Sequence, residues 1–365
     1  MQDIAIYDAA DRAATVHCGH WATIRAMRPD FFAGQGFPTR IERLAELRYL
    51  FDAMSKWDSG PVLQEMGGAR PEDVARITDA ARRFIDLHRD LLDREPARVP
   101  LGTLAYQYLV TRKVAAFPHH ASVLDIGPGE GYQSFYLSED SSIESYAGIE
   151  VTQSLYMLQT LIGHRAFRGT FRNHAVDLPP YPALHFPTVQ ADGSEALQTL
   201  TVAPSDSIRS QLFPWWKAHL AFETRYDVVM SNENICEMSG EAFAYYAAEI
   251  ARCLTREGVF LIHGIGKTLK PEVLNERFQI LSVLGFRGYI QETTFKNDGR
   301  LHTPNLVLVP PGNSRHETAS TTYTVRRFEE DDPVVRAVYS LDRPAGEITT
   351  HAELVNAVRE SLGDY

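Results

Sequence analysis

The sequence of 365 residues predicts an α/β protein, in which a mostly parallel sheet follows a helical N-terminal region. From residue 121 onward, short apolar runs alternate with helical patterns, which is typical of βαβ units and a buried parallel sheet. A glycine-rich segment directly follows the first apolar run, and a pair of strand-like runs follows the last one. We therefore divide the chain into a helical region of residues 1–118, an α/β domain of residues 119–312 and a C-terminal appendage of residues 313–365.

The N-terminal region contains three helical patterns. In residues 39–51, apolar positions recur at spacings of three and four, which indicates one buried helix face. Residues 71–88 begin with a proline and two carboxylates, the residues favoured in a first helical turn. Residues 101–117 form the third pattern, which ends at Pro118. We expect these helices to cover a ligand cleft and shape an acceptor pocket, or to form an oligomer contact.

Five apolar runs are predicted as the parallel strands of the sheet. They are residues 122–126, 146–150, 188–192, 226–231 and 259–263. The helical patterns between and after them are residues 153–161, 194–200, 241–254 and 271–284. Residues 288–295 and 305–309 then surround a polar turn and are predicted as an antiparallel pair at the end of the sheet. The tail contains a strand-like run at 321–328 and a helical pattern at 351–362. In such a sheet, a ligand is expected at the carboxyl ends of the parallel strands.

Composition restricts the classes of function. The chain has 36 Lys and Arg against 47 Asp and Glu, a net charge of −11, which argues against broad binding to a phosphate backbone. No stretch approaches the roughly 20 apolar residues of a membrane span, and no secretory leader is visible. Cys18, Cys236 and Cys253 are widely spaced and fit a reducing compartment. We expect a cytoplasmic enzyme without nucleic-acid or membrane partners, and the sequence is compatible with a homodimer.

The most informative segment is Asp-Ile-Gly-Pro-Gly-Glu-Gly, which runs from Asp125 to Gly131 directly after the first predicted strand. Glycines allow a tight turn and a close approach of the backbone to a ligand that a Cβ would repel. A dinucleotide fingerprint requires glycine or alanine at the sixth position counted from Gly127, where Tyr132 stands. The segment therefore disfavours a nicotinamide site. A plain strand-to-helix turn without a ligand is the alternative.

The spacing D-x-G-x-G-x-G resembles the first motif of the Rossmann-like, class I S-adenosylmethionine-dependent methyltransferases. The resemblance implies a seven-stranded sheet with an antiparallel terminal strand, and S-adenosylmethionine as the cofactor. The residues that it places around the cofactor are Asp125, Gly127, Gly129, Gly131, Glu150 and Asp192. Glu150 ends the second predicted strand, about 20 residues after the glycines, where an acid can accept hydrogen bonds from ribose hydroxyls. Its alternative role is that of a solvated carboxylate at a strand end.

Asp192 ends the third predicted strand and precedes a predicted helix. The resemblance implies a contact between Asp192 and the edge of the adenine. An aspartate in an Asp-Gly turn, or one that caps a helix, is an equally good interpretation of the same residues.

Polar side chains also follow the fourth and fifth predicted strands. Asn232, Glu233 and Glu237 follow the fourth, and the two acids share one face if the backbone is helical there. A solvated loop with acids at a helix N-terminus is the alternative. His263 ends the fifth strand, where it could accept a proton from an acceptor hydroxyl or simply bond within the strand end. We predict His263 as the base, Glu237 and Glu233 as further candidates, and Asn232 as a positioning group. No tight ligand motif calls for a metal.

Residues 213–217, 227–229 and 231–239 together resemble the sugar O-methyltransferase family, within a segment of resemblance that covers about residues 122–267. The implied activity is methyl transfer from S-adenosylmethionine to an oxygen of a small polar metabolite or sugar, in natural-product or glycan biosynthesis. The partner is then a small-molecule acceptor. Two other classes stay open: a nicotinamide-dependent oxidoreductase on a related fold, and a non-catalytic cofactor-binding module.

Overall fold

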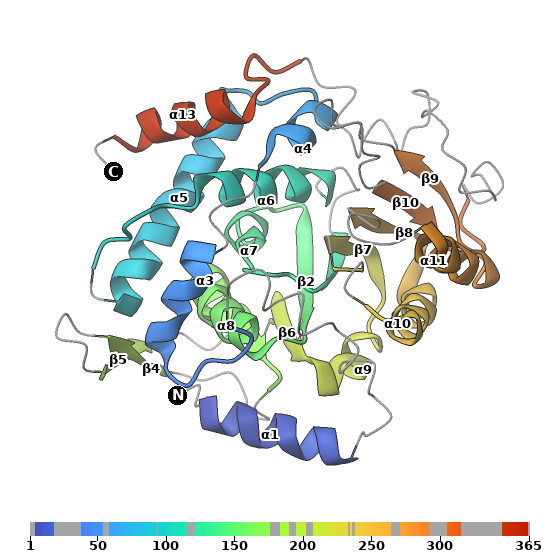
Figure 1. Ribbon diagram of the computed structural model, residues 1–365, viewed down its shortest axis with the longest axis horizontal. Helices are drawn as coiled ribbons and strands as arrows, with labels where there is room; N and C mark the ends of the chain where they lie inside the picture. Colours follow the sequence, from blue (N-terminus) through green and yellow to red (C-terminus); the bar gives the residue numbers. More distant parts are fainter. Residues whose placement is uncertain are drawn as a thin grey trace.

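The computed structural model shows a central sheet with helices on both faces. Helices of the N-terminal region lie around this core (Figure 1). The described residues are 4–17, 38–53, 58–92, 94–114, 121–175, 183–189, 195–201, 207–232, 234–235, 238–263, 271–291, 305–314 and 345–363. None of the helices in these ranges combines the length and the apolarity that crossing a membrane requires.

The described residues form an eight-stranded sheet with the order β3-β6-β2-β1-β7-β8-β10-β9. The bounds are β1 Ala121–Ile126, β2 Ile143–Glu150, β3 Phe171–Asn173, β6 Ser210–Pro214, β7 Tyr226–Asn232, β8 Leu254–His263, β9 Arg287–Gln291 and β10 Asn305–Val309. β10 lies antiparallel between β8 and β9, and the pairings among the other strands are parallel. The predicted Rossmann-like α/β fold with an antiparallel terminal strand is confirmed, and β3 adds an eighth strand at the edge.

Apolar side chains cover both faces of this sheet. Because successive strand residues point to opposite faces, Val123 and Val228 belong to one core, and their neighbours Leu124 and Val229 belong to the other. The first core packs against α5 (Pro71–Leu92), α6 (Leu101–Val114), α7 (Gln133–Leu137) and α8 (Gln153–Phe167). The second packs against α9 (Ala218–Ala221), α10 (Gly240–Cys253) and α11 (Pro271–Val283). With both faces covered, a ligand can reach the parallel strands only at their ends.

The N-terminal helices confirm most of the predicted pattern. α5 and α6 begin at the predicted residues, and the apolar positions of residues 39–51 are buried as expected. The helix predicted over residues 39–51 forms only in part, as a 3₁₀ turn η1 (Leu44–Leu47) followed by α3 (Arg48–Ala53). Before these elements, the main chain of Ile41 bonds to the Gln153 side chain, at 2.9 Å through its N–H and at 3.1 Å through its carbonyl. These bonds use backbone groups that a helix would otherwise satisfy.

The C-terminal helix α13 (His351–Leu362) lies along α5 (Figure 1). It begins with a capping box, in which Thr350 and Glu353 each bond to the other's backbone N–H. Just before α13, Ile348 forms an isolated antiparallel bridge with Ala69, which connects the tail to the segment that precedes α5. The predicted helix at 351–362 is therefore confirmed, whereas the strand predicted at 321–328 lies outside the described residues.

The third predicted parallel strand, residues 188–192, is wrong where the structure describes it. Residues 188 and 189 end β4 (Ala183–Val189), which pairs with β5 (Glu195–Thr201) in a separate antiparallel two-stranded sheet, and residues 190–192 lie outside the described residues. The helix predicted at 194–200 is wrong for the same reason, because the apolar residues that suggested it pair across the hairpin instead. The strand that pairs with β2 is β6, whose five residues end at Pro214. β6 was not predicted, because its run of Ser-Gln-Leu-Phe-Pro is short and shows no clear apolar pattern.

Candidate functional site

The glycine turn after β1 has an unusual backbone. Gly127, Gly129 and Gly131 have φ angles of +70°, +61° and +74°, in the left-handed region that favours glycine. A Cβ on Gly127 would lie 2.2 Å from Asn234 Nδ2, and one on Gly131 would lie 2.8 Å from Gln159 Cγ. A Cβ on Gly129 would meet no described atom within 4 Å. Two of the glycines therefore make room for neighbouring side chains, and Gly129 faces open space.

Asp125 precedes this turn and is fully buried. Its Oδ2 accepts hydrogen bonds from Gln133 Nε2 and from the Tyr146 hydroxyl, the latter at 3.2 Å. Among the described residues, nothing donates to its Oδ1. Burial raises the pKa of Asp125 to about 7, against the opposing effect of the two hydrogen bonds, and nearby Glu150 raises it further. Asp125 therefore retains one oxygen that could accept a hydrogen bond from a ligand.

Glu150 ends β2 and is also buried. Its Oε1 accepts the backbone N–H groups of Val151 at 2.8 Å and Thr152 at 2.7 Å, and its Oε2 accepts Gln159 Nε2 at 2.8 Å. Burial raises the pKa of Glu150 to about 7, although these hydrogen bonds favour the ionised form. The Thr152 side chain also interacts with this carboxylate. Each carboxylate oxygen has about two acceptor positions, and Oε2, which accepts the bond from Gln159, keeps a position for a further donor.

These two carboxyls predict how the stability of the ligand-free protein depends on pH. Each has a pKa of about 7 in the folded state, compared with 3.8 and 4.5 for the unperturbed groups. The folded protein therefore binds these protons more tightly than the unfolded chain does. Their contribution to stability is complete below about pH 4 and is lost as the pH rises through about 7. We expect Asp125→Asn and Glu150→Gln each to reduce the fall in Tm between pH 5 and pH 8.

Thermal unfolding of the two variants at both pH values checks this expectation. Glu223→Gln, which changes an exposed carboxyl between α9 and β7, serves as the control and should keep the wild-type difference in Tm. A wild-type difference in both buried-site variants would contradict the prediction.

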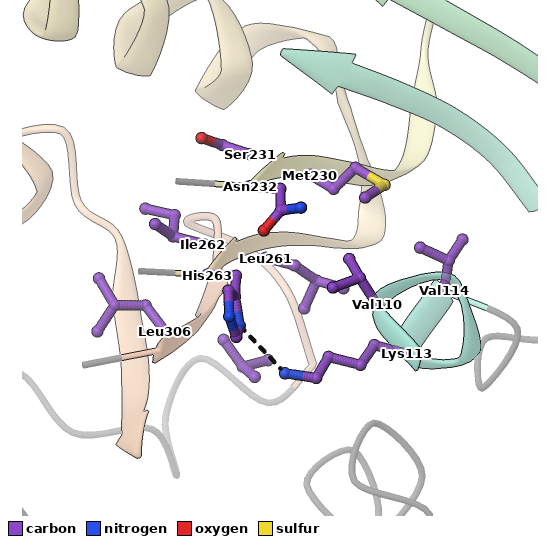
Figure 2. Close-up of a pocket in the computed structure, with 11 residues that line it drawn as sticks. Val110, Lys113, Val114, Met230, Ser231, Asn232, Leu261, Ile262, His263 and Leu306 are labelled. Carbon is purple, nitrogen blue, oxygen red and sulfur yellow. Dashed lines mark hydrogen bonds between the residues drawn. The ribbon is translucent and has the colours of Figure 1, made fainter. Parts of the chain in front are cut away.

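A second polar group lies at the carboxyl ends of β7 and β8 (Figure 2). Asn232 and His263 are register partners on these neighbouring strands. Tyr106 of α6 donates its hydroxyl to Asn232 Oδ1 at 2.8 Å, and its ring meets the imidazole of His263 edge-on with centroids 5.7 Å apart. Lys113, also on α6, places its Nζ 3.4 Å from His263 Nδ1. The structure therefore brings together two of the predicted catalytic residues and adds two side chains from α6.

A small cavity lies among these residues. Its other walls include the apolar side chains of Val110, Met230, Leu261 and Leu306. Its volume is about 20 Å³, which is enough for about one water molecule. Apolar walls lower the local dielectric and strengthen the electrostatic interactions of polar groups that face the cavity.

The contact with Lys113 determines what His263 can do. In a neutral imidazole, one nitrogen donates and the other accepts. When Lys113 donates to Nδ1, the imidazole proton is on Nε2, which can then only donate. When the ring proton is on Nδ1 and Lys113 does not donate to that atom, Nε2 is able to accept a proton. His263 can therefore act as a base through Nε2 only in this second tautomer.

Asn234 connects the two groups along the carboxyl edge of the sheet. It lies against Gly127 of the turn, and it is two residues beyond Asn232 of β7. Its Oδ1 accepts a hydrogen bond from the Ser231 hydroxyl. Because β1 and β7 are adjacent parallel strands, the glycine turn and the Asn232–His263 pair lie at the same end of the sheet.

Three of the predicted site residues, Asp192, Glu233 and Glu237, lie outside the described residues. Asp192 was expected to end the third parallel strand, and the described strand that pairs with β2 is β6, which ends at Pro214. The contact of Asp192 with adenine stays a prediction.

The end of β6 is covered by α1 (Ile4–His17), which lies near α8 and β6 in Figure 1. Trp215, the residue after β6, donates its indole N–H to Asp11 Oδ1 at 2.6 Å. The Tyr7 ring packs against Tyr156 and Trp216, with centroids 5.0 and 4.9 Å apart. The N-terminal extension therefore contributes side chains directly next to the sheet end that carries Glu150.

Sequence reasoning missed Gln159, Asn234 and Lys113. Gln159 and Lys113 are polar residues within the almost entirely buried helices α8 and α6. A polar residue on a buried helix is a signal that a sequence can provide, since such groups need partners. The sequence alone could not identify those partners, because they lie in strands and turns that are distant along the chain. Within the described ranges, no group of three or more His, Cys, Asp or Glu side chains could hold a metal ion.

No protein-family model matches this chain, and no curated protein matches its sequence. Solved structures do match. Magnesium protoporphyrin IX methyltransferase (ChlM) from Synechocystis PCC 6803 with bound SAM has a TM-score of 0.37 at 12% identity, over 67% of this chain and 99% of that chain. Precorrin-6y C5,15-methyltransferase from Geobacter metallireducens GS-15 has a TM-score of 0.33 at 12% identity, over 56% and 85% of the two chains. The O-methyltransferase from Bacillus cereus in complex with SAH has a TM-score of 0.33 at 9% identity, over 56% and 78%. The activities named, and the SAM and SAH bound in two of these structures, are those of the proteins concerned.

Proposed function

We propose that this protein transfers a methyl group from S-adenosylmethionine to an oxygen of a small polar molecule. The observation that carries the proposal is the position of β10, which lies antiparallel between β8 and β9 in a sheet whose first strand ends in a glycine turn. A nicotinamide-binding sheet more often continues in parallel. Tyr132, which stands where a dinucleotide turn needs a small residue, is fully buried against Phe84 and Phe135.

The residues around the turn fit the proposed cofactor. The open space next to Gly129 gives a ligand access to the backbone, and Asp125 Oδ1 has no hydrogen-bond donor among the described residues. Glu150 can accept one more hydrogen bond, as a ribose hydroxyl would require. Asp125, the glycine turn and Glu150 would therefore hold the cofactor, which supplies a methyl group on a sulfonium sulfur.

The second polar group would serve the acceptor. As the acceptor oxygen bonds to the methyl carbon, the carbon–sulfur bond breaks and the hydroxyl proton must leave. We assign this proton to His263 Nε2, in the tautomer whose ring proton is on Nδ1. Asn232, held by Tyr106, would position the acceptor hydroxyl. Alignment of the reacting atoms supplies about 7–11 kcal/mol in such reactions, and a positioned base adds roughly a hundred- to ten-thousand-fold in rate.

The acceptor class follows from the resemblance of residues 122–267 to sugar O-methyltransferases. We therefore propose a sugar or a similarly polyhydroxylated metabolite of natural-product or glycan biosynthesis as the acceptor. Glu233 and Glu237 remain further candidates for the base.

Binding of the demethylated cofactor tests the proposal before any acceptor is known. We expect S-adenosylhomocysteine to raise the Tm of the protein and to release measurable heat in calorimetry, because a ligand that binds only the folded state stabilises it. NADH at the same concentration should change neither quantity. A folded protein that binds NADH, or that shows no heat with S-adenosylhomocysteine, would contradict the proposed function.

A further inference from the structure

The side chain of Gln159 links the glycine turn to Glu150. Its Nε2 donates one hydrogen bond to the backbone oxygen of Gly129 at 2.5 Å and a second to Glu150 Oε2 at 2.8 Å. Its Cγ is so close to Gly131 that a Cβ there would lie only 2.8 Å away. The amide group of Gln159 therefore lies between the turn after β1 and the acid at the end of β2.

These neighbours fix the orientation of the amide. The Gly129 carbonyl can only accept a hydrogen bond, so the end of the amide that contacts both this carbonyl and Glu150 must be the NH₂ group. Both amide hydrogens are then used. The carbonyl oxygen Oε1 is buried, and among the described residues it accepts no hydrogen bond. Gln159 as a whole is only 5% exposed. A buried acceptor without a donor is uncommon in folded proteins and calls for an explanation.

The place of this acceptor fits a ribose. In open α/β sheets, a nucleotide ligand crosses the carboxyl ends of the strands, with its ribose near the acid that ends the second strand. A ribose presents two adjacent hydroxyls, each of which needs an acceptor when it is buried. Glu150 can accept one more hydrogen bond, and Gln159 Oε1 is a second acceptor beside it.

We propose that Gln159 is a ribose-binding residue, whose Oε1 accepts one of the adjacent hydroxyls of an adenosyl ribose while Glu150 accepts the other. This inference rests on the proposed function, because it assigns the ligand of that site. The bonds to Gly129 and Glu150 hold the amide in place before the ligand arrives, so that little side-chain freedom is lost on binding. A site built in this way rejects a deoxyribose, because a buried acceptor then stays unpaired.

Calorimetry with S-adenosylhomocysteine and its 2′-deoxy and 3′-deoxy counterparts tests the inference on the full chain. In the wild type, we expect each deoxy ligand to bind at least about tenfold more weakly than the parent compound. Gln159→Met keeps the length of the side chain but removes its polar atoms. It should bind S-adenosylhomocysteine at least about tenfold more weakly than the wild type does and should lose most of the discrimination at one of the two hydroxyls. Thr160→Val, which changes the next residue of α8 and removes a hydroxyl that bonds to the Tyr156 carbonyl, should keep wild-type binding.

Circular dichroism establishes that each variant is folded. Wild-type or tighter binding by Gln159→Met, or full discrimination at both hydroxyls, would overturn the inference and leave Gln159 a packing residue. If Gln159→Met does not fold, the wild type alone decides, because equal binding of the parent and both deoxy ligands also overturns it. A folded wild type that does not bind S-adenosylhomocysteine contradicts the proposed function itself, which distinguishes the two failures.

Discussion

Gly129→Ala is expected to weaken the binding of S-adenosylhomocysteine by at least about tenfold while leaving the protein folded, since a loss of 1.4 kcal/mol corresponds to about tenfold. Gly129 has a φ of +61°, and a Cβ built on it meets no described atom within 4 Å. The substitution should therefore cost only the strain of a left-handed alanine, about 1–2 kcal/mol. The added methyl group would project into the space that we assign to the ligand. Calorimetry and thermal unfolding of the same preparation measure the two effects separately.

Gly312→Ala provides a matched control. Gly312 has a φ of +81° and equally open surroundings among the described residues, but it lies beyond β10, outside the proposed cofactor residues. We expect a similar loss of Tm in this variant and unchanged binding. If both alanine variants bind the ligand as the wild type does, the ligand does not approach the turn at Gly129.

His263→Ala is expected to lower kcat by a hundred- to ten-thousand-fold, the usual contribution of a positioned general base. The affinity for S-adenosylhomocysteine should stay near the wild-type value, because His263 lies at the end of β8, whereas the proposed cofactor residues end β1 and β2. The measurement is release of S-adenosylhomocysteine with an acceptor identified by testing a panel of sugars and hydroxylated metabolites. His219→Ala, an exposed histidine on α9, is the control and should turn over normally.

Lys113→Met adds a test of how His263 acts. Without the lysine, its donation to Nδ1 no longer favours the tautomer with the ring proton on Nε2, so we expect activity to persist with a shifted pH–rate profile. Near-normal turnover in His263→Ala would exclude His263 as the base and direct attention to Glu233 and Glu237. The cofactor assignment would be unaffected.

Local sequence was sufficient to predict the first two parallel strands and the turn between them. A short apolar run that ends in glycines and an acid at the end of the next run depend on neighbouring residues, and both appear in the structure. The strand beside β2 could not be found in this way. A hairpin, β4 and β5, precedes β6 in the chain, and its residues have at least as strong a local strand pattern as Ser210–Pro214.

The contacts of the candidate site were less predictable than its position. Asn232 and His263 were expected at the carboxyl edge because they end neighbouring strands, and register alone brings them together. The partners Tyr106 and Lys113 come from a helix more than a hundred residues earlier, and Gln159 reaches the turn from α8. Such contacts depend on how helices pack over the sheet, for which a single sequence has no local signal.

The bridge between Ala69 and Ile348 and the packing of α13 on α5 have a consequence for biosynthesis. Leu354 and Val358 of α13 belong to the core that contains Ile77 and Phe84 of α5. A nascent chain on the ribosome therefore cannot finish this core until α13 has emerged from the exit tunnel, long after α5. A chain truncated before α13 would leave apolar surface of α5 uncovered and would be prone to aggregate.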